Sequence, residues 1–167
     1  GVLLKPIFQL NLLNRLLTAI DQSTIDNIKP NQRNYRAIPT PRWSVLLADD
    51  NMINQEVGRE ILRSLSCQVH LANNGVEAVQ AYQQQPFDLI FMDCNMPELD
   101  GFGASIQIRQ YETQQADPFH TPIIAFTADV MPSTRDRCLA VGMDDYLAKP
   151  LIFDDLQKKL ERWLGSR

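Results

Sequence analysis

Three carboxylates and one ammonium in this chain lie just after short apolar runs. They belong to Asp49, Asp50, Asp93 and Lys149. Side chains at the carboxyl ends of neighbouring strands in a parallel sheet meet at one edge of that sheet. If the apolar runs are such strands, the four groups would come together and hold a divalent cation and a phosphoryl group.

The residue types indicate which chemistry this edge would support. Close carboxylates raise one another's pKa unless a cation lies between them, and an all-oxygen set without His or Cys favours Mg²⁺ over zinc. The carboxylate of Asp93 can attack phosphorus and form an acyl phosphate. Lys149 would supply a positive charge to the phosphoryl oxygens, and Thr127 a hydroxyl. Taken alone, Asp49 and Asp50 could equally form a solvated turn or a helix cap, and Thr127 could be a cap.

The elements that must position these groups alternate along the chain. The runs that qualify as strands are Trp43–Ala48, Cys67–Ala72, Phe87–Met92, Pro122–Phe126 and Asp145–Ala148. Helical periodicity predicts helices at about 52–65, 75–85, 102–114, 132–141 and 153–164. This alternation predicts an α/β fold, a doubly wound five-stranded parallel sheet with five helices. With strand order 2-1-3-4-5, the ligand crevice lies between the first and third strands.

Composition excludes several classes of protein. The chain has 167 residues, 44% of them hydrophobic, which allows one well-cored domain with an appendage. A net charge of −4 with scattered Lys and Arg gives no reason to expect nucleic acid as a partner. Cys67, Cys94 and Cys138 lack the spacing of a disulfide framework or zinc site, so a reducing, cytoplasmic setting fits best. No apolar stretch approaches the ~20 residues that span a bilayer.

The first 42 residues differ from the rest. Residues 1–20 repeat, at a fixed offset, the Leu-x-Lys-Pro pattern and helical periodicity of the chain's end, which indicates the last strand and helix of a preceding, similar domain. An unrelated amphipathic helix is the alternative. Either way residues 10–20 form an N-terminal helical appendage whose apolar side chains need a cover, from the main domain or from self-association with another copy. Residues 21–42 contain three prolines and are typical of a linker, which leaves the main domain at 43–165.

Four separated motifs point to one family. They are Asp49-Asp50, Asp93 with Met96-Pro97 and Asp100-Gly101, Thr127-Ala128, and the segment from Gly142 to Pro150. In this order they resemble the receiver domain of two-component response regulators, over about residues 43–165. The resemblance implies that Asp93 is the phospho-acceptor. It also implies that Asp49, Asp50, Asp93 and the main-chain carbonyl of Asn95 bind Mg²⁺.

The same resemblance assigns roles to further residues. Lys149 and Thr127 would bind the phosphoryl group, and Tyr146 would switch rotamer as Thr127 moves. Asn95 and Asp129 stand where family members tune the lifetime of the acyl phosphate. Pro150 holds Lys149 in an extended backbone, and the sequence leaves open whether their peptide bond is cis.

The sequences around two of the motifs, Leu-Ala-Asp-Asp-Asn and Met-Asp-Cys-Asn-Met-Pro, are similar to those of receivers within hybrid sensor histidine kinases. Such a receiver catalyses its own phosphorylation from a histidine of the kinase core and passes the group to a histidine phosphotransfer domain. The parent chain would be a histidine kinase, and anchoring of that parent in the inner membrane is compatible with the sequence.

Three rival interpretations fit the sequence less well. A haloacid dehalogenase-type enzyme needs two acids separated by one residue on its first strand, whereas the acids here are adjacent. A calcium-binding loop would need Gly at the position where this chain has Glu98, so its spacing does not fit. A phosphorylation-silent pseudo-receiver that binds protein partners is the third, and the complete set of acids, Thr and Lys argues against it. His70 and His120 lie away from the strand ends, and we expect surface or loop positions for both.

Overall fold

A single five-stranded parallel sheet lies at the centre of the computed structural model, which describes residues 42–115, 119–128 and 131–165. The strands are β1 (Trp43–Ala48), β2 (Cys67–Ala72), β3 (Leu89–Asp93), β4 (Ile123–Thr127) and β5 (Asp145–Ala148). Their order, β2-β1-β3-β4-β5, confirms the predicted doubly wound sheet and is the order of flavodoxin-like folds. Parallel pairing therefore brings the carboxyl ends of β1, β3, β4 and β5 to one edge.

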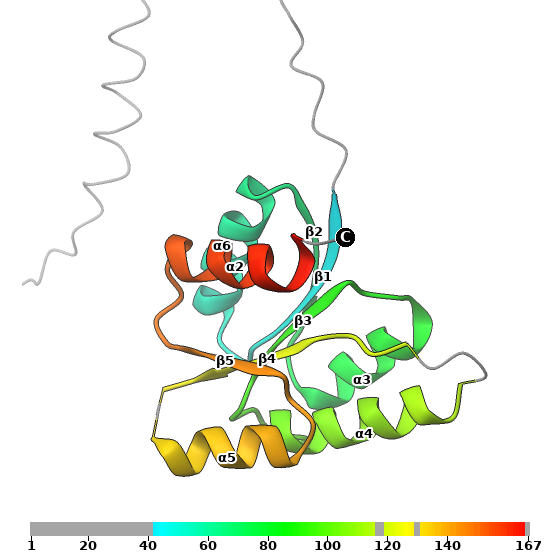
Figure 1. Cartoon of the computed structure of the whole chain (residues 1–167). Coiled ribbons are helices and arrows are strands. Elements are labelled where there is room, and N and C mark those ends of the chain that lie inside the picture. Colours follow the sequence, from blue (N-terminus) through cyan, green and yellow to red (C-terminus); the bar gives the residue numbers. More distant parts are fainter. Residues whose placement is uncertain (1–41, 116–118, 129–130, 166–167) are drawn as a thin grey trace, which may run out of the picture. The chain divides into compact units, whose positions relative to one another are not determined.

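Five helices cover the two faces of the sheet. They are α2 (Met52–Ser64), α3 (Gly75–Gln84), α4 (Gly101–Thr113), α5 (Pro132–Ala140) and α6 (Phe153–Leu164). Figure 1 shows α2 and α6 above the sheet and α3, α4 and α5 below it. Each helix matches its predicted range to within one residue at either end. The predicted appendage at residues 1–20 and the predicted linker at 21–42, apart from Arg42, lie outside the described residues.

Local capping by side chains explains where α2, α3 and α4 begin. The side chain of Asn74 accepts the main-chain N–H of Glu77, and that of Asp100 accepts the N–H of Gly103. The cap of α2 is Asn51, not the preceding acids, so the interpretation of Asp49 and Asp50 as helix caps is wrong. The carboxylates of Asp49 and Asp50 are therefore not used to cap α2.

The third strand begins two residues later than the sequence predicted. Asp88 donates its main-chain N–H to the Ser44 carbonyl at 2.8 Å, and its carboxylate accepts the Ser44 N–H at 2.8 Å. Asp88 is therefore hydrogen-bonded to the beginning of β1. The regular pairing of β3 starts at Leu89, opposite Val45. The strand then continues through Asp93, so the carboxylate belongs to the last residue of the strand.

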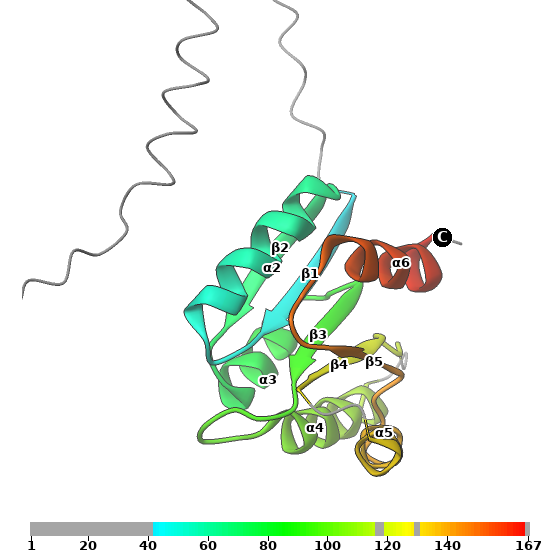
Figure 2. The same ribbon diagram turned by 90° about the vertical axis from the view of Figure 1, so that its left-hand side faces the viewer.

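Figure 2 shows the sheet between two sets of helices, and an apolar layer lies on each face of the sheet. One layer joins the sheet to α2 and α6, and the other joins it to α3, α4 and α5. All residues of β3 and β4 are buried, as expected for central strands of a doubly wound sheet. Phe91 and Phe126 stack across β3 and β4 with ring centroids 5.1 Å apart, which ties together the strands that carry Asp93 and Thr127.

Backbone constraints shape the loop after β3. A Cβ atom at Gly101 would collide with the main-chain carbonyl oxygen of Asp93, so only glycine lets α4 start so close to that strand end. Glu98 adopts a left-handed φ of 66°, at the position where a calcium loop would have needed glycine. Gly142, the residue after the predicted fourth helix, has a φ of 89° and follows the last turn of α5.

A buried polar cluster occupies the opposite edge of the sheet. The Arg109 guanidinium donates to Glu112 at 2.7 Å, to Asp144 at 2.8 Å and to the Thr121 carbonyl at 3.0 Å. Glu112 also accepts the Tyr82 hydroxyl at 2.6 Å. One cation therefore satisfies two carboxylates that anchor α4 and the start of β5.

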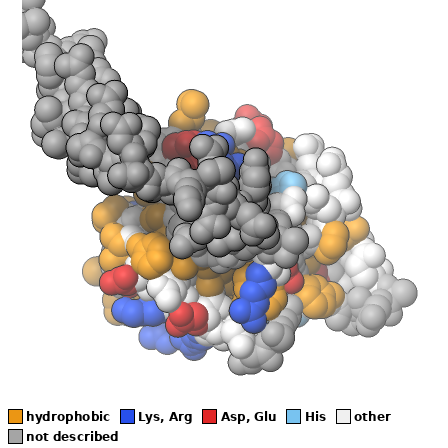
Figure 3. Space-filling view, turned by 90° about the horizontal axis from the view of Figure 1, so that it is seen from above, with side chains coloured by type: hydrophobic (Ala, Val, Ile, Leu, Met, Phe, Trp, Pro, Cys, Tyr) orange, Lys and Arg blue, Asp and Glu red, His pale blue; other side chains and the backbone are white. Residues whose placement is uncertain are grey.

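The surface carries mixed charge. On the face in Figure 3, hydrophobic side chains are interspersed with acidic and basic ones, as expected from the scattered Lys and Arg in the sequence. None of the described helices combines the length and the apolarity that crossing a bilayer would require.

Replacing Arg109 with methionine should destabilise the fold by roughly 3 kcal/mol, because the buried carboxylate of Glu112 and the half-buried carboxylate of Asp144 would lose their cation. Chemical denaturation measures this change in the free energy of unfolding. Arg63→Met is the matched control, since the Arg63 side chain is 56% exposed and should lose no more than about 0.5 kcal/mol. Equal losses in the two variants would contradict the role of the cluster.

Candidate functional site

The ends of β1, β3 and β5 bring two carboxylates and an ammonium into direct contact. Lys149 Nζ lies 2.6 Å from Asp93 Oδ2 and 2.8 Å from Asp49 Oδ2. Asp49 is fully buried and Asp93 is 3% exposed, so both charges are largely removed from water. The ammonium therefore neutralises carboxylates that are separated by 44 positions in the chain.

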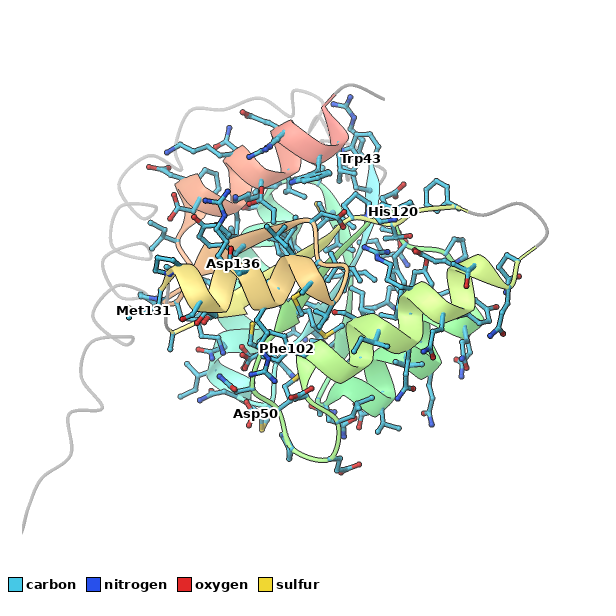
Figure 4. All side chains as sticks on the ribbon, turned by 60° about the horizontal axis from the view of Figure 1, so that its bottom comes forward. Trp43, Asp50, Phe102, His120, Met131 and Asp136 are labelled. Carbon is cyan, nitrogen blue, oxygen red and sulfur yellow. The ribbon has the colours of Figure 1, made fainter. Side chains whose placement is uncertain are left out.

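Asp50 completes the acidic group that the sequence predicted. One carboxylate oxygen from each of Asp49, Asp50 and Asp93 lies within 4.8 Å of the others, and Asp50 is exposed to solvent. Octahedral Mg²⁺ holds adjacent ligand oxygens about 3 Å apart and opposite ones about 4.2 Å apart, so this oxygen-only set has the right chemistry for that ion and would draw closer together to bind it. Figure 4 shows Asp50 at the loop edge of the domain.

The pKa shifts follow from burial and from the ion pair. Burial raises the pKa of Asp93, and the Lys149 ammonium and the Asn95 N–H, which lies 3.1 Å from Asp93 Oδ1, only partly offset this effect. Burial lowers the pKa of Lys149, but hydrogen bonds and charge from Asp49 and Asp93 outweigh it and leave the pKa raised. Lys149 is therefore cationic, whereas ionisation of Asp93 destabilises the folded state.

Sequence reasoning missed the residues that hold Asp49. The Gln55 side-chain amide donates to the Asp49 carbonyl at 2.6 Å and to the Ala72 carbonyl at 3.2 Å, which joins the ends of β1 and β2. Asn51 and Asn54 contact the Asp49 carboxylate. The signal was present in the sequence, because carboxamides recur in the first turn after the acid pair.

The remaining predicted residues lie around this cluster. Thr127 ends β4, is 3% exposed, and accepts the Lys149 N–H on its main-chain carbonyl at 2.8 Å. Tyr146 is half-buried on β5, with the Arg135 and Lys159 cations each 5.7 Å from its ring centroid. The Lys149–Pro150 peptide bond is cis. Asp129 lies outside the described residues.

The histidines lie away from the cluster. His120 is exposed, as predicted, and its Nε2 lies 2.7 Å from Asp144 Oδ1. Figure 4 shows it on the side of Trp43, opposite Asp50. His70 is half-buried within β2 with its ring edge-on to Phe87, so the prediction of a surface or loop position is wrong for this residue.

All three cysteines are buried and free. The Cys94 and Cys138 sulfurs are 4.0 Å apart, so these thiols join the residue after Asp93 to helix α5. Burial raises the pKa of Cys94 to about 12 and that of Cys67 to about 11. These thiols are therefore core residues with little thiolate.

Comparison with known protein families accounts for this arrangement. The model of the response regulator receiver domain matches residues 45–161, which is most of the chain. The chain belongs to the response regulator receiver domain family. The receiver domain's acids, threonine and lysine all fall within the matched range.

Relatives of the receiver domain include long signalling proteins. The chain is 40% identical over 126 residues to hybrid signal transduction protein dokA of Dictyostelium discoideum, covering 75% of this chain and 7% of that protein. It is 37% identical over 134 residues to probable histidine kinase 6 of Oryza sativa subsp. japonica, covering 71% of this chain and 14% of the relative. The receiver domain thus corresponds to a small part of each relative.

Solved structures share the fold. The receiver domain of sensor histidine kinase PA1611 from Pseudomonas aeruginosa is 43% identical, with a TM-score of 0.66, covering 74% of this chain and 98% of that one; it has a magnesium ion coordinated in its active-site cleft. The receiver domain of the Saccharomyces cerevisiae response regulator Ssk1, crystallised with the histidine phosphotransfer protein Ypd1, is 35% identical with a TM-score of 0.70, covering 74% of this chain and 90% of that one.

Replacing Asp93 with asparagine should stabilise the fold at pH 7 without Mg²⁺, by roughly 0.5–2 kcal/mol, because a costly buried charge is removed. The pKa of Asp93 is raised in the folded state, so its ionisation destabilises the fold at pH values above both pKa values. The gain should therefore shrink as the pH falls toward 3.8, the ordinary pKa, where Asp93 becomes protonated in both states. Denaturation of wild type and variant across this range measures it.

Asp136→Asn, at an exposed position of α5, is the control and should change stability by no more than about 0.5 kcal/mol at any pH. If Asp93→Asn instead destabilised the fold at pH 7, the Lys149 ion pair would outweigh the cost of burial.

The native protein should react very slowly with thiol reagents at pH 8. Only about one Cys94 thiol in 10⁴ is ionised at that pH when the pKa is near 12, and the thiolate is the reactive form. Counting thiols with a chromogenic disulfide reagent should yield three rapidly reacting groups in denaturant and almost none in the native state. Rapid labelling of the native protein would show that the helices open readily.

Proposed function

We propose that this receiver domain accepts a phosphoryl group on Asp93 from a phosphohistidine of a histidine kinase core and passes it to a histidine phosphotransfer domain. The observation that carries the proposal is the Lys149 ammonium, 2.6 Å from Asp93 and 2.8 Å from Asp49, beside a third acid at one sheet edge. A carboxylate nucleophile next to a fixed cation suits phosphoryl transfer better than simple structural pairing.

In the proposed reaction an Asp93 carboxylate oxygen attacks phosphorus. The bond from phosphorus to the donor's imidazole nitrogen breaks, and the products are an acyl phosphate on Asp93 and a free histidine. Asp49, Asp50, Asp93 and the main-chain carbonyl of Asn95 would hold Mg²⁺. When bound, that ion would neutralise charge on the phosphoryl oxygens. The magnesium ion in the similar PA1611 receiver supports this assignment.

Lys149 and Thr127 would respond to the new group. Phosphorylation adds negative charge and acceptor oxygens, so the ammonium that now contacts the carboxylates would bind the phosphoryl oxygens together with the Thr127 hydroxyl. Movement of Thr127 would free space for Tyr146, whose ring is half-buried on the adjacent strand. Asn95 and Asp129 remain predicted to tune the lifetime of the acyl phosphate.

The proposed setting is a hybrid sensor histidine kinase. The relatives named above support it, although the chain covers only 7% and 14% of their lengths. The complex of Ssk1 with Ypd1 supports a histidine phosphotransfer protein as partner. A cytoplasmic position, a parent anchored in the inner membrane, and residues 1–20 as the end of a preceding domain able to self-associate stay predictions.

Intact mass spectrometry of the whole chain after incubation with acetyl phosphate tests the proposal. Wild type should gain one phosphoryl group with Mg²⁺ and essentially none without it. Asp93→Asn should gain none, because its amide is not a nucleophile for phosphorus, while its fold is kept. Asp136→Asn, an exposed change of the same kind, should be labelled like wild type.

Persistent labelling of the Asp93 variant would assign the acceptor to another residue. Absence of any adduct on wild type, with failure to bind beryllofluoride as well, would favour the silent pseudo-receiver that acts through protein contacts alone.

A further inference from the structure

The Asp49 carboxylate is held by neutral donors as well as by Lys149. Asn54 Nδ2 lies 3.1 Å from Asp49 Oδ1 and 3.2 Å from Asp49 Oδ2, so a single side-chain amide bridges both oxygens. The main-chain N–H of Asn51 donates to Oδ1 at 2.9 Å. Asp49 is fully buried, so these contacts, and not water, fix the plane of its carboxylate.

The start of α2 explains why Asn54 can reach this carboxylate. The side chain of Asn51 caps the helix and accepts the N–H groups of Ile53 at 2.8 Å and Asn54 at 3.4 Å. Side chains in a first helical turn point back toward the helix N-terminus, which here faces the end of β1. Gln55 fixes the main-chain carbonyl of Asp49 at the same time. The backbone of Asp49 and its carboxylate are thus oriented by separate carboxamides.

We propose that Asn54 is a positioning residue that orients Asp49 for Mg²⁺ and makes the site selective for Mg²⁺ over Ca²⁺. This inference rests on the proposed function. Lys149 is charged and would move to the phosphoryl oxygens, whereas Asn54 is neutral and can keep its hydrogen bond to one Asp49 oxygen while the other binds the ion. Mg²⁺ requires near-octahedral ligands, but Ca²⁺ accepts variable geometry, so loss of orientation weakens Mg²⁺ binding more.

Asn54→Leu tests this, because leucine has a similar size and no donor. We expect Mg²⁺ affinity to fall about tenfold or more, as for other residues that orient metal ligands, while Ca²⁺ affinity changes less than about threefold. Isothermal titration calorimetry of the whole chain with each chloride salt, at constant ionic strength, measures both dissociation constants. Asn54→Gln keeps an amide donor and should recover part of the Mg²⁺ affinity.

Gln80→Leu is the matched control, since it removes an amide at an exposed position of α3 and should leave both affinities unchanged. Asn54→Ala carries the same expectation if leucine disturbs the fold. If an Asn54 variant kept the wild-type Mg²⁺ affinity, or lost affinity equally for the two cations, the role of Asn54 would be overturned. The proposed function would be unaffected by that result. Failure of wild type to bind Mg²⁺ would overturn the proposed function as well as that role.

Discussion

The fold of this receiver domain depends on keeping two buried carboxylates neutralised at one edge of its sheet. Asp49 and Asp93 lie at the ends of adjacent strands with almost no access to water, where unneutralised charges would cost several kcal/mol. Lys149 reaches both from the end of β5. One ammonium serves two acids. A group that draws Lys149 away from them must therefore carry negative charge itself, and this links the electrostatics of the site to its proposed chemistry.

The apolar core makes that arrangement rigid. β3 and β4 are buried along their whole length, and the Phe91–Phe126 stack joins them just before the site. Packed interiors transmit small displacements because they contain few voids. Carboxylates mounted on such strands keep their spacing far better than side chains on loops would. The loop after β3 adds to this, since Gly101 lets α4 begin against the Asp93 carbonyl.

The helices are not anchored equally. Arg109 secures α4 and the start of β5 through Glu112 and Asp144 at the far edge of the sheet. In α5, by contrast, Cys138 is the single buried residue, and it contacts Cys94 directly after Asp93. Elements with little buried surface open most easily. Helix α5 therefore suits a role in which its position changes with the state of the nearby site.

The strand order came from the resemblance to receiver domains, whereas the sequence by itself determined the alternation of strands and helices and the meeting of Asp49, Asp50, Asp93 and Lys149 at one edge of the sheet. The alternation and this meeting follow from local periodicity and from the geometry of parallel sheets, in which all carboxyl ends share an edge. The tertiary structure alone decided the contact of Asn54 with Asp49 and the pairing of Arg109 with Asp144, 35 positions away. Such contacts depend on the distance and rotamer of side chains from different elements, which local patterns do not encode.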